Sequence, residues 1–118
     1  MLKDKSTRNL AAGEALRALG LTDAAATRYY FALYQAAVHR LTKLGWTPGS
    51  IQVGGVEWNH DMVVSNAYLV RRRRTDRALV DAIFTLRTMA DYHEDSIDPS
   101  HLAAELADVR EFVEEATA

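Results

Sequence analysis

We expect the fold to be organised around RRRRTDRALVDAIFTLRTMADYH, residues 71–93, with the other helices packed about it. The stretch opens with four arginines and continues as an amphipathic helix, for which Thr75 or Asp76 is a suitable cap. Apolar residues recur along it at helical spacing. They are Leu79, Ala82, Ile83, Leu86 and Ala90. The stretch ends in side chains capable of chemistry, namely Arg87, Asp91, Tyr92 and His93.

The whole chain has the length and composition of one soluble globular domain, residues 1–118, with 48% hydrophobic and 25% charged residues. It has no cysteine, which excludes disulfides, zinc–thiolate sites and thiol catalysis. The first ten residues lack the apolar run of a secretory signal. The longest uncharged stretch, Leu44 to Val56, holds 13 residues, too few to span a membrane. We therefore expect a cytoplasmic protein.

The remaining segments are also typical of helices. We expect a first helix from Lys5 to Leu19 and a second one, capped by Thr22, to Leu44. The second is apolar nearly all round, which is typical of a central helix. A short or bent helix from Val56 to Val70 and a last helix opened by Asp98-Pro99 complete the set. The prediction is an all-α, antiparallel bundle of four long helices and one shorter helix.

The core stripe of the first helix is predicted from its apolar spacing. Its members are Leu10, Ala11, Ala15, Leu16 and Leu19. Inside the apolar zone of the second helix stands Arg28, which needs either a partner or a route to solvent.

Charge is unevenly distributed, although the net value is only −2. Five of the seven residues from Arg71 to Arg77 are arginine, and five acids lie between Glu105 and Glu115. The basic run of Arg71, Arg72, Arg73 and Arg74 is a candidate site for a polyanion such as RNA. The alternative is that the basic and acidic segments pair with each other.

The cluster near residue 90 can be read in two ways. Arg87 and Asp91 share a helical face, and His93 is expected at or beyond the end of the helix. An arginine that holds phosphate and a histidine that moves a proton could transfer a phosphoryl group without a metal. In the simpler alternative Arg87 pairs with Asp91 and His93 is a solvated cap. His60 is a packing histidine or a second candidate. No metal site or cofactor is predicted.

Two motifs resemble the HEPN-domain family. Residues 27–37, TRYYFALYQAA, resemble the "SRAYYAMFHAA" helix of its small members, and residues 86–92, LRTMADY, resemble its "LRxxADY" signature. The motifs are in the expected order, and the likeness extends over nearly the whole chain. The resemblance implies a helical bundle that is usually a homodimer. Many members are ribonucleases of toxin–antitoxin and defence systems, and others accompany a minimal nucleotidyltransferase.

Site residues also follow from the resemblance. Ribonuclease members carry an arginine and, four to six residues on, a histidine, a spacing that Arg87 and His93 match. By this likeness Arg87 would contact phosphate and His93 would be the acid or base. Tyr92 before His93 departs from the usual catalytic form, and the "ADY" branch often lacks the histidine. There, Arg87, Asp91 and Tyr92 would instead form a structural or nucleotide-contacting network with Arg28, and His60 would be the second functional histidine.

The leading hypothesis is therefore an RNA-directed HEPN-like domain, in its sharpest form a metal-independent endoribonuclease with no cofactor. The alternative is a non-catalytic module that binds a nucleotide or a partner protein, such as an antitoxin or a nucleotidyltransferase. In a third reading, the protein is a structural dimer in which Arg87 and Asp91 only order the bundle.

Overall fold

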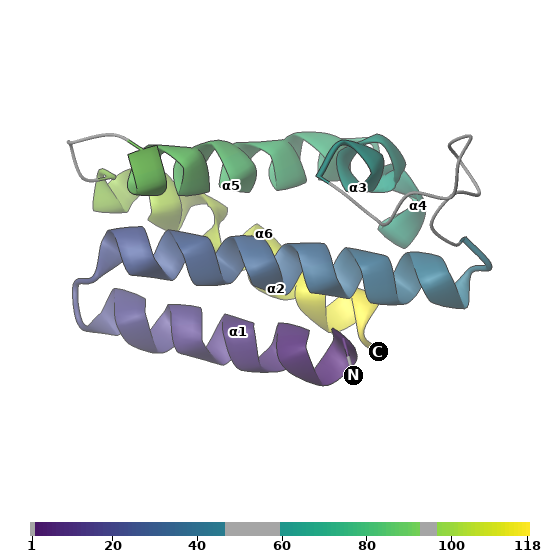
Figure 1. The fold of residues 1–118 in the computed structure, drawn as a ribbon, viewed down its shortest axis with the longest axis horizontal. Coiled ribbons are helices and arrows are strands. Elements are labelled where there is room, and N and C mark those ends of the chain that lie inside the picture. Colours follow the sequence, from purple (N-terminus) through teal and green to yellow (C-terminus); the bar gives the residue numbers. More distant parts are fainter. Residues whose placement is uncertain (1, 47–59, 93–96) are drawn as a thin grey trace.

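The computed structural model describes residues 2–46, 60–92 and 97–118, and every element in these ranges is a helix (Figure 1). In chain order the elements are α1 (Leu2–Ala18), α2 (Thr22–Lys43), α3 (His60–Asn66), α4 (Tyr68–Arg71), α5 (Thr75–Tyr92) and α6 (Pro99–Ala116). The predicted all-α class is confirmed. The molecule measures 40 × 29 × 25 Å. Within the described ranges, no helix is both long and apolar enough to cross a membrane.

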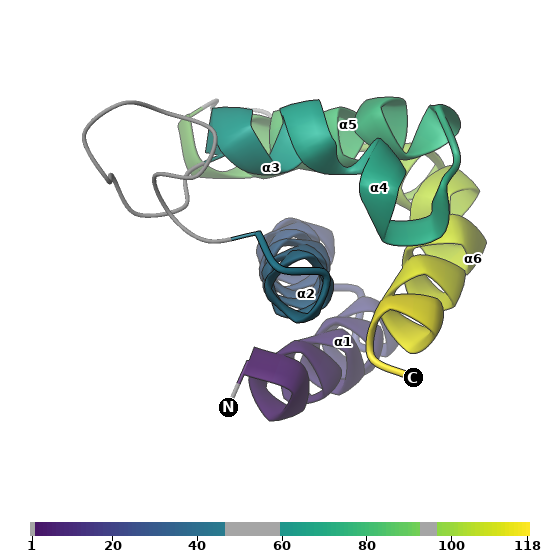
Figure 2. The same ribbon diagram turned by 90° about the vertical axis from the view of Figure 1, so that its right-hand side faces the viewer.

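The central element is α2. It contacts each of the other five helices, with α1 on one side, α3 to α5 on the other, and α6 along the flank (Figure 2). By contrast, α1 does not contact α5. The expectation that the chain packs around residues 71–93 is therefore wrong. The reason lies in composition, because α2 buries alanines and tyrosines on most of its circumference and so offers surface to neighbours on every side.

The packing of α1 on α2 depends on small residues. The buried residues of α1 are Ser6, Leu10 and Gly13, so the predicted stripe is correct at Leu10 and wrong at Leu19, which is 74% exposed. The Ser6 hydroxyl donates a hydrogen bond of 2.6 Å to the carbonyl of Ala32. A short polar side chain and a glycine therefore form the contact face, and this lets the two backbones approach closely.

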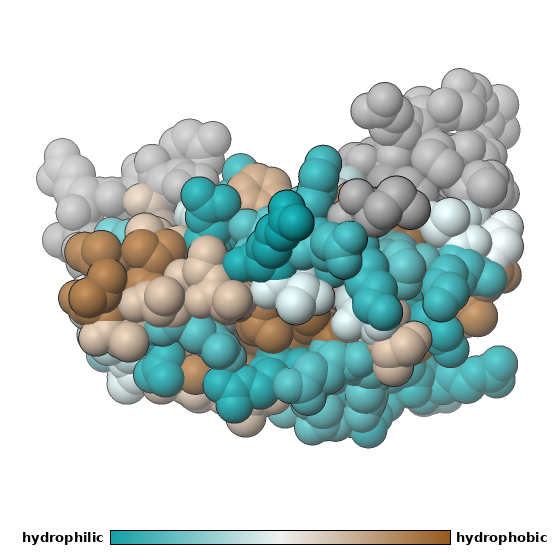
Figure 3. All heavy atoms as spheres, turned by 90° about the horizontal axis from the view of Figure 1, so that it is seen from below, coloured by the Kyte–Doolittle hydropathy of each residue, from teal (hydrophilic) through white to brown (hydrophobic). Residues whose placement is uncertain are grey.

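The turn between α1 and α2 uses Gly20, whose φ of 78° ends the first helix. The predicted cap of α2 is wrong: Thr22 is already helical, and Leu21 stands at the cap position without a side-chain hydrogen bond. Instead, the Asp23 carboxylate accepts a hydrogen bond of 2.9 Å from the backbone N–H of Ile97. Apolar side chains gather at this end of the molecule (Figure 3), where Leu21 is 52% exposed.

The predicted third helix is divided in the structure. Residues 56–59 lie outside the described part, and the remainder forms α3 and α4 with a break at Ala67. Arg72, in the left-handed conformation with φ of 57°, ends α4, and α5 begins at Thr75. The arginine run is therefore the end of α4 and the connector to α5. It is not the start of one long helix, and Thr75 and Asp76 lie within α5.

The start of α6 is as predicted. The Asp98 carboxylate accepts a hydrogen bond of 2.9 Å from the backbone N–H of Ser100, and Pro99 occupies the first turn. The buried side chains of α6 include Leu102, Val109 and Phe112. The helix contacts both α4 and α5, and Glu111 and Glu115 in its C-terminal half lie beside the arginine run.

Candidate functional site

The side chain of Arg71, the first arginine of the run, is largely covered and paired. Its side chain is 6% exposed and that of Asp76 is 1% exposed. The guanidinium donates two hydrogen bonds to the carboxylate, Nη2 to Oδ1 at 2.6 Å and Nε to Oδ2 at 3.1 Å. It also lies 5.2 Å from the ring centroid of Phe112. The hydrogen bonds to Asp76 raise the pKa of Arg71 above its ordinary value.

Arg73, the third arginine, reaches α6. Its Nη1 donates a hydrogen bond of 2.7 Å to Oε1 of Glu111, and its Nη2 lies 3.6 Å from Oε1 of Glu115. Arg71 approaches the same two acids at 3.3 and 3.4 Å. The hydrogen bond from Arg73 lowers the pKa of Glu111. Pairing between the basic run and the acidic last helix therefore accounts for two of the four arginines.

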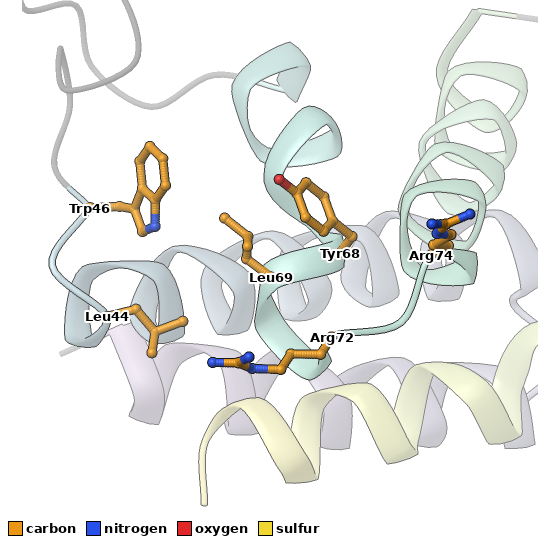
Figure 4. Close-up of a pocket in the computed structure, with 6 residues that line it drawn as sticks. All are labelled: Leu44, Trp46, Tyr68, Leu69, Arg72 and Arg74. Carbon is orange, nitrogen blue, oxygen red and sulfur yellow. The ribbon is translucent and has the colours of Figure 1, made fainter.

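The other two, Arg72 and Arg74, are exposed and have no acidic partner within the described ranges. Together with Trp46, Tyr68, Leu44 and Leu69 they line a groove of about 480 Å³ (Figure 4). Trp46 follows the end of α2, and Tyr68 opens α4. The Arg72 side chain extends toward Leu44, whereas Arg74 lies beyond Tyr68. The groove thus combines aromatic walls with two available positive charges.

A second, smaller hollow adjoins the groove. It measures about 280 Å³ and is lined by Tyr68, Arg74 and Arg77. Because Tyr68 and Arg74 line both hollows, Tyr68 stands between them. Arg77 is likewise exposed and has no acidic partner in the described structure. Three available arginines therefore surround one tyrosine, of which 42% is exposed.

Arg87 lies in a different environment from the arginine run. Its Cζ is 4.9 Å from the ring centroids of both Tyr30 and Phe31, so the guanidinium covers these aromatic rings. Tyr30 in turn packs against Phe84 with ring centroids 5.5 Å apart. Burial raises the pKa of Tyr30, and the charge of Arg87 partly offsets this effect. The LRTMADY motif is thereby joined through Arg87 to the TRYYFALYQAA motif.

The other residues predicted near Arg87 are placed only in part. Asp91 and Tyr92 form the last turn of α5, and His60 is the first residue of α3. His93 lies outside the described residues, as do the side chains of Asp91, Tyr92 and His60. The proposed pairing of Arg87 with Asp91 and the catalytic pair of Arg87 with His93 therefore stay predictions.

Arg28 has the route to solvent that its position requires. It is exposed, and its Nη1 donates a hydrogen bond of 3.1 Å to Oδ1 of Asn9 on α1. The Nδ2 of Asn9 donates one of 2.9 Å to Oε1 of Gln35. Both hydrogen bonds tie α2 to α1. Neither of them tests the expected network of Arg28 with Arg87.

Among the remaining polar groups, His39 has a buried Nε2 atom for which the described residues offer no hydrogen-bond partner. Burial lowers the pKa of His39, and the charges of Lys43, Lys3 and Arg40 lower it further. In the described part of the chain, no three side chains of His, Asp or Glu gather as a metal ion would require.

Trp46, Tyr68 and Arg77 were not predicted as functional residues. Tyr68 stands three residues before the arginine run, and an aromatic residue next to basic ones is a signal for nucleic-acid binding. Trp46 offers no such signal, because it lies 22 positions before Tyr68 and only the fold brings the two together. No family model, curated relative or solved structure matches the chain.

Proposed function

We propose that this chain is a HEPN-like helical domain that binds RNA, with Arg72 and Arg74 as phosphate contacts. One observation carries the proposal: acids neutralise Arg71 and Arg73, whereas Arg72 and Arg74 border an aromatic-walled groove. Guanidinium groups form strong charge-assisted hydrogen bonds with phosphate oxygens. The attraction is local, because the net charge of the chain is −2.

The family part of the proposal has a separate basis. It rests on the resemblance of residues 27–37 and 86–92 to HEPN motifs, and it includes the antiparallel bundle of four long helices and the homodimer. The described helices of 17 to 22 residues, α1, α2, α5 and α6, are of the lengths that such a bundle requires. The contact of Arg87 with Tyr30 and Phe31 also links the two motifs.

The sharper form is a metal-independent endoribonuclease of a toxin–antitoxin or defence system, with Arg87 and His93 as its catalytic pair. The alternative is a non-catalytic module that binds a nucleotide, an antitoxin or a nucleotidyltransferase. One observation favours the alternative: Arg87 packs over two aromatic rings, so it contributes to the stability of the bundle whether or not it contacts phosphate. RNA binding through Arg72 and Arg74 is common to the ribonuclease and to an RNA-binding module.

The test is a binding titration with fluorescently labelled RNA at several salt concentrations. The R72Q/R74Q variant should bind more weakly, and the slope of log K against log salt should fall by about 0.7 for each lost phosphate contact on a single strand. R73Q is the matched control, because Arg73 is already paired with Glu111. Equal losses in R73Q and R72Q/R74Q, or no binding by the native protein, would contradict the proposal.

A further inference from the structure

We infer that the groove between Trp46 and Tyr68 accepts an unstacked nucleobase, so that the RNA bound at this surface is single-stranded. The inference rests on the proposed RNA binding and specifies the class of RNA. It is carried by the combination of exposed ring surface, a cavity of about 480 Å³, and arginines on two sides of one tyrosine.

The walls of the groove are suited to a flat, apolar face. Trp46 is half-buried, and Tyr68 and Leu44 are 42% and 46% exposed, so ring and aliphatic surface faces the solvent. In Figure 4, Trp46 and Tyr68 stand on opposite sides of Leu69, which lies between them. A base that enters here would stack on an aromatic ring and cover the leucines. Each such stacking contact contributes about 1–3 kcal/mol.

The arginines are placed for the backbone on both sides of that base. The left-handed conformation of Arg72 reverses the chain direction at the end of α4. Arg71 can then enter the buried pair with Asp76 while Arg72 returns along the groove toward Leu44. Beyond Tyr68, Arg74 and Arg77 line the adjoining hollow. A strand that crosses Tyr68 therefore meets a guanidinium before and after the stacked base.

A duplex fits this arrangement poorly. Its bases are paired and stacked inside, so that it presents phosphates and sugars but no free base face. A duplex would engage the arginines and leave the groove empty. An acidic peptide would also satisfy the charges, but it lacks the planar faces that two aromatic walls bind best. A single-stranded nucleic acid uses both features, and RNA is the one that the proposed function specifies.

The experiment compares three probes by tryptophan fluorescence. The chain has two tryptophans, so the W58F variant leaves Trp46 as the only one. The probes are an oligouridylate of about ten nucleotides, an RNA duplex of equal length, and polyglutamate. The oligouridylate should quench Trp46 and bind at least tenfold more tightly than the duplex, and polyglutamate should leave the Trp46 emission unchanged.

A second measurement does not depend on W58F. With labelled oligouridylate and the otherwise native chain, Y68A should weaken binding by about 5- to 150-fold, which corresponds to the loss of one stacked base. Y68F should keep most of the native affinity for the oligouridylate, because it retains the ring. Y68A should leave the affinity for duplex RNA unchanged.

The outcomes separate the two proposals. Equal affinity for single strand and duplex, with Y68A indistinguishable from the native protein, would overturn the inference. If R72Q/R74Q still weakened binding in that case, the proposed function would stand. Quenching of Trp46 by polyglutamate as strong as that by RNA would assign the groove to acidic peptides and overturn the inference. Absence of any RNA binding would remove both proposals.

Discussion

The Arg71 guanidinium and the Asp76 carboxylate form a buried, two-bonded ion pair, with Nη2–Oδ1 at 2.6 Å and Nε–Oδ2 at 3.1 Å. The pair joins the end of α4 to the first turn of α5, and the ring of Phe112 from α6 lies 5.2 Å from the guanidinium. Three elements therefore meet at one charge pair. Because the groove residues flank this junction, its integrity determines the position of Arg72 and Arg74.

Removal of Asp76 should be severely destabilising. D76A leaves the buried Arg71 without its main partner, which costs about 3–5 kcal/mol of the free energy of unfolding. Urea denaturation measures the loss. The R71M/D76L double variant should be milder than D76A, because it leaves no unpaired charge. E111Q, which removes only an exposed partner, should have much the smallest effect. A D76A variant as stable as the native protein would contradict the role of the pair.

Gly13 should resist substitution despite its position within a helix. A Cβ at this residue would lie 2.9 Å from Cδ1 and Cε1 of the buried Tyr29 ring. Overpacking of this kind costs about 1–3 kcal/mol, which outweighs the gain of about 1 kcal/mol in helix propensity. G13A should therefore lower the melting temperature. In a Y29L background the same change should raise it, and a lowering in both backgrounds would refute the steric explanation.

Stability should depend on pH through His39. Burial and neighbouring cations hold its folded pKa below the ordinary value of 6.5, so the folded state favours the neutral ring. The contribution to stability is fully present above pH 6.5 and is lost as the pH falls toward the folded pKa. Melting temperatures of the native protein and H39Q between pH 8 and about pH 5 measure it. The native protein should lose more stability than H39Q over this interval, and parallel curves would argue against the prediction.

Ribonuclease activity is the sharpest consequence of the family resemblance. If Arg87 and His93 form the catalytic pair, the purified protein should cut RNA in EDTA, and both R87A and H93A should abolish the cutting. In R87A the loss of the contact with the rings of Tyr30 and Phe31 should lower the free energy of unfolding by about 0.5–2 kcal/mol. The assay should therefore be run well below the melting temperature of this variant.

The control for this assay is H101A, which removes an exposed histidine on α6. Undiminished cutting by H93A would end the assignment of His93 and transfer the test to H60A. Complete absence of cutting by the native protein would leave the binding module as the preferred form.

Local signals predicted the helical elements well. Asp98 and Pro99 start α6 as predicted, because the cap depends on residues that are adjacent in sequence. The apolar circumference of α2 also indicated its central place. The cap at Thr22 and the stripe through Leu19 failed, because a distant backbone group recruits Asp23 and because small residues form the contact between α1 and α2.

The site was less predictable, because its parts are distant in sequence. The sequence does not show which arginine of the run will pair with Asp76, although the side chain of Arg71 is 6% exposed and Arg72 is exposed. The difference arises from the ion pair of Arg71 with Asp76, from two acids 40 and 44 residues further along the chain, and from the left-handed turn at Arg72. The aromatic walls of the groove likewise come from two separate helix ends.

The pairing of Arg71 and Arg73 with α6 makes the charge of the connector a property of the folded state. In an unfolded chain the run carries four positive charges without fixed partners, whereas folding neutralises two of them. Detachment of α6 would therefore make this segment more cationic and raise its affinity for any polyanion. The acids of the last helix act as counterions, so that within the run only Arg72 and Arg74, beside the groove, keep a free charge.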